Sequence, residues 1–175
     1  MQFEIEKALP VLERTPQVIE TLLYGLADEW LHSNEGGDTW TPFDIVAHLI
    51  VGEKTDWIPR TLLIVGEGNK EFVPFDMMGH IKVGKGKTMS QLLDEFKALR
   101  KENLAQLKAL DITDEVLDRT GYHPMLGTVT LRHLLASWVV HDLTHIHQLS
   151  RVMAKQYDEA VGPWKQFMGV LGGKR

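Results

Sequence analysis

Apolar residues recur every three to four positions along most of the 175-residue chain, the spacing that gathers them on one face of an α-helix. The pattern predicts long helices over residues 16–31, 42–65, 88–109 and 130–154, with short ones over residues 3–13 and ending near residue 170. No segment alternates with period two for long enough to predict a β-strand. The expected fold is therefore all-α, a four-helix bundle.

Two Thr-Pro pairs mark predicted helix starts. In Thr15-Pro16 and Thr41-Pro42 the threonine can cap free backbone N–H groups, and proline suits the first helical position. We therefore expect a break near Pro16, and a kink at Pro59 in the helix that follows Thr41-Pro42.

Two connections of the predicted bundle are long. Residues 66–87 lose helical periodicity and gather Gly, Pro and Lys, and residues 111–129 hold one short helical turn at most. Thr88 and Gln91 form a capping-box pattern that ends the first connection. Connections of this length in compact proteins are often functional.

The composition is that of an ordinary globular protein, with 43% hydrophobic and 25% charged residues. We expect one domain over residues 1–175, whose core is large enough to fold without a disulfide or structural metal. The chain has no cysteine, which excludes thiolate zinc sites and cysteine nucleophiles. It has 8 histidines, so we looked for metal chemistry among them.

The formal charge of −5 does not provide the basic surface that nucleic-acid binding needs. The N-terminal segment lacks the continuous apolar stretch of a secretory signal, and no run approaches the ~18 apolar residues of a membrane helix. We therefore expect a cytoplasmic protein that acts on a small molecule, without nucleic-acid or membrane partners.

Histidines on the last long predicted helix suggest a metal site. His141 and His145 lie about 40° apart on one helical face, whereas His133 and His147 fall away from it. Imidazoles at positions i and i+4 can point at one ion. A third ligand must come from another helix, and His48 is the one histidine on the helix expected over residues 42–65.

Alternatives remain for each of these residues. The three histidines can instead be ordinary core residues of a purely structural bundle. Asp44, Asp56 and Gln148 lie one or two turns from a candidate ligand and are candidates to orient it, but each also suits a capping or solvated role. His80 and His123 stand beside Gly or Pro and are candidates to line the mouth of a pocket, although we expect solvated turn residues. Among the tryptophans, Trp57 and Trp138 are near enough to the histidine faces to wall a pocket.

Three stretches resemble the DinB family, also called DinB/YfiT-like metalloenzymes. They are TPFDIVAHLIVGEKTDWIPR, KTMSQLLDEFKALRKENLAQL and TLRHLLASWVVHDLTHIHQLSRVMA. The resemblance implies a four-helix bundle, frequently a homodimer, with a divalent metal on three histidines that map onto His48, His141 and His145. It also implies thiol S-transferases and isomerases among the relatives, using bacillithiol, mycothiol or glutathione.

The resulting hypothesis is a metal-dependent enzyme that acts on a small molecule by thiol transfer or hydrolysis. Three histidines leave coordination positions open, as in catalytic sites. Imidazole suits several transition metals, of which we expect zinc or nickel. A thiol nucleophile would have to be a low-molecular-weight cosubstrate, because the chain has no cysteine. The alternative is a noncatalytic, dimeric stress-response protein that binds a metal or ligand without turnover.

Overall fold

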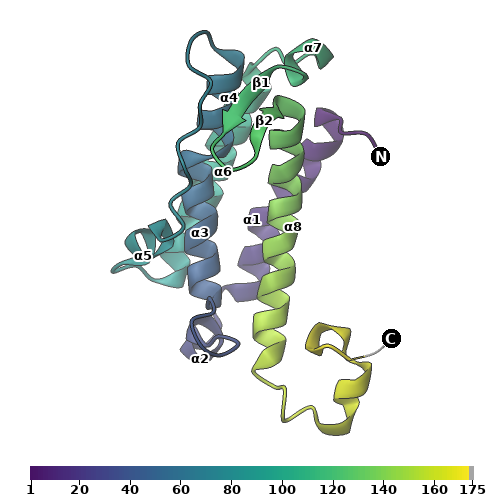
Figure 1. Ribbon diagram of the computed structural model, residues 1–175. Helices are drawn as coiled ribbons and strands as arrows, with labels where there is room; N and C mark the ends of the chain where they lie inside the picture. Colours follow the sequence, from purple (N-terminus) through teal and green to yellow (C-terminus); the bar gives the residue numbers. More distant parts are fainter. Residues whose placement is uncertain (174–175) are drawn as a thin grey trace.

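The computed structural model describes residues 1–173 and consists mainly of helices (Figure 1). The elements are α1 (Ile5–Leu23), α2 (Asp28–His32), α3 (Pro42–Thr55), α4 (Trp57–Val65), α5 (Gly79–Gly84), α6 (Met89–Ala109), α7 (Asp114–Leu117), β1 (Thr120–His123), β2 (Gly127–Thr130), α8 (Leu131–Lys155) and the 3₁₀ turns η1 (Gly162–Phe167) and η2 (Gly169–Leu171). Helices α1, α3, α6 and α8 pack together, and α4 continues the line of α3. This arrangement is the predicted four-helix bundle.

Helix α1 contradicts the predicted break near Pro16. It runs without interruption from Ile5 to Leu23, with Pro16 buried inside it. A proline in a helix leaves the carbonyl four residues earlier without its usual donor. Here that carbonyl belongs to Leu12, and it accepts a hydrogen bond of 2.8 Å from Nη1 of Arg100 on α6. The bundle thus supplies the bond that proline removes.

The helix predicted over residues 42–65 is divided into α3 and α4 at Asp56. The predicted kink is therefore present, but it falls before Pro59 rather than at it. Pro59 cannot donate to the carbonyl of Thr55, and its ring crowds that carbonyl, which accounts for a division just N-terminal to the proline. As a result Asp56 lies at a junction between two helices.

Capping boxes begin the three long helices that follow α1. They pair Thr41 with Asp44, Thr88 with Gln91 and Thr130 with His133. In each, the threonine hydroxyl accepts the backbone N–H three residues later and that residue's side chain accepts the N–H of the threonine. Asp44 and His133 are therefore held at helix starts, which is the capping role that was the alternative for Asp44.

Both long connections contain more structure than the sequence predicts. Residues 66–87 include α5, and residues 111–129 contain α7 and most of an antiparallel hairpin in which Thr120 faces Thr130. The backbone around Phe72 bonds to Tyr122 of β1, with Phe72 N–H donating at 2.9 Å. A Cβ on Gly121 would lie 2.7 Å from the Phe72 ring, so the close approach of the two connections requires glycine there.

The interior holds two hydrophobic clusters with a charged network between the helices. One cluster is built around Ile19, Ile45, Phe96 and Leu149, and the other around Leu12, Trp57, Leu107 and Trp138. In the network, the buried guanidinium of Arg100 donates to Glu53 at 2.7 Å and to Asp142 at 2.6 Å. Asn103 donates to the second oxygen of Glu53 at 2.9 Å. Together with the bond to Leu12, the network joins α1, α3, α6 and α8.

Opposing effects act on the charges of this network. Burial raises the pKa of Glu53, against the attraction of Arg100. Burial by itself lowers the pKa of Arg100, but the carboxylates of Asp142 and Glu53 outweigh it and leave that pKa above its usual value. Arg100 therefore stays charged, and the carboxylates depend on it for compensation.

Within residues 1–173, no helix is both long enough and apolar enough to cross a bilayer. The longest helix, α8, carries charged and imidazole side chains along its whole length.

Replacing Arg100 with Met should lower the free energy of unfolding by about 3–5 kcal/mol, because Glu53 and Asp142 would stay buried without their cation. Urea unfolding at pH 7 measures the change. The matched control is Lys101→Met, since Lys101 is the next residue and is exposed; it should change stability by less than ~0.5 kcal/mol. Equal effects of the two substitutions would contradict a structural role for the network.

Candidate metal centre

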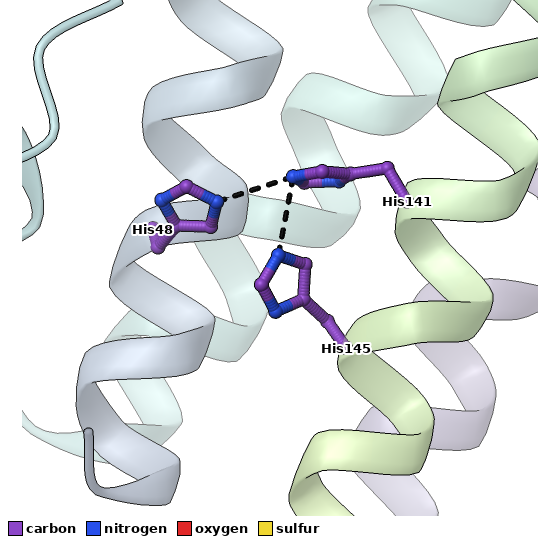
Figure 2. Close-up of side chains that lie close together, drawn as sticks. All are labelled: His48, His141 and His145. Carbon is purple, nitrogen blue, oxygen red and sulfur yellow. Dashed lines mark hydrogen bonds between the residues drawn. The ribbon is translucent and has the colours of Figure 1, made fainter. Parts of the chain in front are cut away.

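The bundle brings His48, His141 and His145 together from α3 and α8. Their Nε2 atoms point toward one another in the space between the two helices (Figure 2). The Nε2 atom of His141 lies 3.1 Å from that of His48 and 3.1 Å from that of His145. The structure thus places together the three histidines that the spacing selected, and it leaves His147 exposed on the outside of α8.

The spacing of these nitrogen atoms fits a single metal ion. Two ligands about 2.05 Å from a tetrahedral ion are separated by about 3.3 Å, close to the observed distances. The donor set consists of imidazoles alone, which suits zinc, nickel, copper or iron rather than magnesium or calcium. The residues present therefore fit a divalent transition-metal ion with open coordination positions.

The surroundings keep the three imidazoles uncharged. Burial, the largest cause, and the neighbouring histidines together lower the pKa of His48 and of His141 to about 3. Burial also lowers the pKa of His145, partly opposed by its hydrogen bond to Gln148. At neutral pH the rings are therefore unprotonated and can each offer a lone pair, as ligation requires.

Gln148 orients one candidate ligand. Its Oε1 atom lies 2.8 Å from Nδ1 of His145, so Nδ1 carries the proton and Nε2 keeps its lone pair for the centre. Gln148 thus makes the orienting contact anticipated for it. Nδ1 of His141 is buried and has no hydrogen-bond partner within residues 1–173.

Aromatic rings surround the centre. The Trp40 ring lies 4.7 Å from that of His48 and is stacked on His145 at 6.3 Å, measured between centroids. Phe75 meets His48 edge-on at 5.2 Å, and Trp57 meets His141 at 5.1 Å. Trp57 fulfils its predicted place at the site. The sequence reading missed Trp40, although an apolar residue just before a capping box often packs onto its own helix.

The expectation that His80 is a solvated turn residue is wrong. Its side chain is buried, with a relative exposure of 6%, because α5 folds back onto α3. Nδ1 of His80 lies 3.0 Å from the carbonyl of Met77, and the ring packs 4.9 Å from Trp40. His80 therefore covers the histidine cluster from behind Trp40. No helical periodicity runs through residues 66–87, so the sequence offered no signal for this fold-back.

Asp56 lies beside the centre rather than in it. Its Oδ1 atom is 3.0 Å from Nη2 of Arg60, yet the two are not aligned for a hydrogen bond. Burial raises the pKa of Asp56 to about 6, against the attraction of Arg60. Asp56 and Arg60 line a cavity of about 310 Å³ that His141 also lines.

Comparison with known proteins places the chain in a family. The sequence profile described as the DinB superfamily matches residues 11–149. The chain belongs to the DinB superfamily. Among solved structures, this chain is similar to YfiT from Bacillus subtilis, with a TM-score of 0.66 and 26% identity over 83% of this chain and 85% of that one. YfiT is described as "a probable metal-dependent hydrolase with an unusual four-helix bundle topology". Comparison with curated proteins gives no match.

The protein, purified without an affinity tag and reconstituted with metal, should bind about one equivalent of zinc or nickel if all three rings ligate. His141→Ala should abolish this binding. His147→Ala, which removes an exposed imidazole from the same helix, should leave it intact. Elemental analysis after gel filtration gives the stoichiometry. Wild-type protein that retains less than about a tenth of an equivalent would contradict the assignment.

The free energy of unfolding of the metal-free protein should decrease as the pH falls below about 6.5. The pKa of His141 is about 3 in the folded protein and about 6.5 when unfolded, so the unfolded state takes up more protons in this window. The loss is at most about 1.4 kcal/mol per pH unit for each such histidine. Urea unfolding between pH 6.5 and 5 should give a smaller slope for His141→Gln and an unchanged one for His147→Gln. The raised pKa of Asp56 has the opposite effect, because it favours the folded state as the pH falls. This contribution is the same in the wild type and both variants, so it does not affect the comparison of slopes.

Proposed function

We propose that the protein is a metal-dependent hydrolase of small molecules, with His48, His141 and His145 as its metal ligands. The observation that carries the proposal is the convergence of three uncharged imidazoles, all within 4.8 Å of one another, in a buried position between α3 and α8. The similarity to YfiT supports the reaction class. The adjoining cavity, with His141 in its wall, offers space for a substrate.

A divalent ion held by His48, His141 and His145 would supply Lewis-acid chemistry, making a water molecule more acidic and polarising a substrate oxygen. The protein's own groups do the remaining work. Gln148 keeps the proton of His145 on Nδ1. Trp40 and Phe75 cover the His48 side of the site and limit the access of bulk water.

Asp56 is the proposed proton acceptor. It is the one carboxylate in the wall of the cavity that His141 lines, and its pKa of about 6 suits an exchange of protons near neutral pH. In hydrolysis the water oxygen bonds to the carbonyl carbon and the bond to the leaving group breaks. Asp56 takes the proton that the water loses and returns it to the leaving group.

Thiol transfer is the second candidate reaction. The chain has no cysteine, so a sulfur nucleophile would enter as a free cosubstrate, and a metal ion would hold it as the thiolate. The third candidate is a protein that binds a metal or ligand without turnover. The identity of the metal, dimer formation, a cytoplasmic location and a single domain over residues 1–175 stay predictions beside this proposal.

The test is an activity screen of zinc- and nickel-loaded protein on small esters and amides, with parallel arms that add cysteine or glutathione and 1-chloro-2,4-dinitrobenzene. We expect hydrolysis that needs no thiol, a loss of at least about 100-fold in kcat/KM for His141→Ala, and little change for His147→Ala. Asp56→Asn should lower kcat at least about tenfold while metal binding is kept.

Each other outcome identifies a different function. Turnover only in the presence of a thiol would replace hydrolysis with S-transfer. Full metal occupancy without turnover in any arm would favour the noncatalytic protein. Equal activity of wild type and His141→Ala would show that the histidine cluster is not the active site.

A further inference from the structure

The cavity beside the centre is built from α4, the hairpin and α8. Its volume is about 310 Å³, enough for a ring or short chain with one polar group, and Trp57, Phe72 and Leu134 contribute apolar walls. The polar side chains that line it come from elements other than the metal-ligating turn of α3. Their hydrogen-bonding states can be read from their contacts.

His123, which is half-buried, and His133, which is exposed, both line this cavity. Nδ1 of His123 accepts the backbone N–H groups of Met125 and Leu126 at 3.1 and 3.2 Å. Nδ1 of His133 accepts the N–H of Thr130 at 3.4 Å. A nitrogen that accepts carries no proton, so each neutral ring bears its proton on Nε2 and is a donor there.

Arg60 adds further donors. Its side chain is 8% exposed, and Nη2 donates to the carbonyl of Val73 at 3.2 Å beside Asp56. Within residues 1–173, its Nε and Nη1 atoms make no hydrogen bond. The guanidinium lies over the Phe72 ring at 5.1 Å, and His123 meets the same ring edge-on at 6.2 Å. Phe72 therefore holds Arg60 and His123 on one side of the cavity.

We infer that this cavity binds a compact oxyanion, a carboxylate in the first place, carried on a small apolar body. N–H donors that line an apolar cavity and have no protein acceptor are well satisfied by an anionic oxygen pair, and Arg matches a carboxylate with two donors at once. The Asp56 carboxylate leaves part of the Arg60 fork unengaged, because the pair is misaligned. The apolar walls select the body of the ligand.

The inference deepens the proposed function and rests on it for its enzymatic meaning. The substrate class is a small acid whose carboxylate lies at Arg60 and His123 and whose hydrolysable group reaches the side of the cavity formed by His141. Arg60 and His123 would then determine specificity. Binding of the acid itself requires no metal, so it can be measured separately from catalysis.

The experiment compares benzoate, benzyl alcohol and benzylamine as probes of metal-free protein, with ¹H–¹⁵N NMR titration following residues 121–129 and the indole of Trp57. Benzoate should bind at least tenfold more tightly than either uncharged or cationic analogue. Arg60→Met should weaken benzoate binding at least tenfold. Arg132→Met, which removes the same charge from a surface arginine paired with Asp114 and Asp118, should leave it within twofold.

A second variant guards against misfolding. In His123→Asn the amide oxygen can still accept the turn N–H groups, whereas the Nε2 donor is lost, so benzoate binding should fall at least threefold with the spectrum of the hairpin retained. Tighter binding of benzylamine would overturn the inference in favour of Asp56 as the recognition group. Equal binding of all three probes, or no shift up to saturation of their solubility, would overturn it as well.

The outcomes separate this inference from the hydrolase proposal. Protein that binds benzoate at this cavity but holds no metal keeps the anion site and refutes the hydrolase. Protein that hydrolyses esters but does not prefer benzoate keeps the hydrolase and refutes the anion site.

Discussion

The buried guanidinium of Arg100 is the interaction on which the arrangement of the helices depends. It bonds to Glu53 of α3, Asp142 of α8 and the Leu12 carbonyl of α1. Asp142 adjoins His141 in sequence, and Glu53 follows His48 by little more than one helical turn. The same contacts that join the four helices therefore also fix the relative position of the two helices that carry the histidine cluster. A site built from α3 and α8 needs such a constraint, because a shift of about 1 Å between ligands disrupts their geometry.

Local signals predict the helix starts that depend only on residues close in sequence. The boxes at Thr88 and Thr130 operate within a few residues, so α6 and α8 begin where the sequence indicates. The continuity of α1 through Pro16 is not predictable from local sequence. The loss of a backbone hydrogen bond at proline is a local property, whereas the donor that replaces it, Arg100, lies on another helix. The hairpin was missed because its strands are only four residues long, too short for a period-two pattern to be recognised.

The contrast between local signals and tertiary packing also applies to the candidate metal centre. His141 and His145 share a helix, so spacing alone placed them on one face, and His48 followed as the histidine available on the second helix. Phe75 and His80 come to the site through the fold-back of residues 66–87 onto α3, and His80 packs there on Trp40. This packing is a tertiary contact, and no pattern of residues along the chain predicts it. Sequence therefore identified the histidines and Trp57, but not Trp40, Phe75 or His80.

The cavity and the histidine cluster draw on largely separate parts of the chain. The cluster uses α3 and the middle of α8, whereas Arg60 stands on α4 and His123 on the hairpin, and His141 alone belongs to both. The hairpin packs on α4 and α8 but supplies none of the three histidines. Changes in the hairpin away from Gly121 would therefore alter the wall of the cavity and leave the three imidazoles in place.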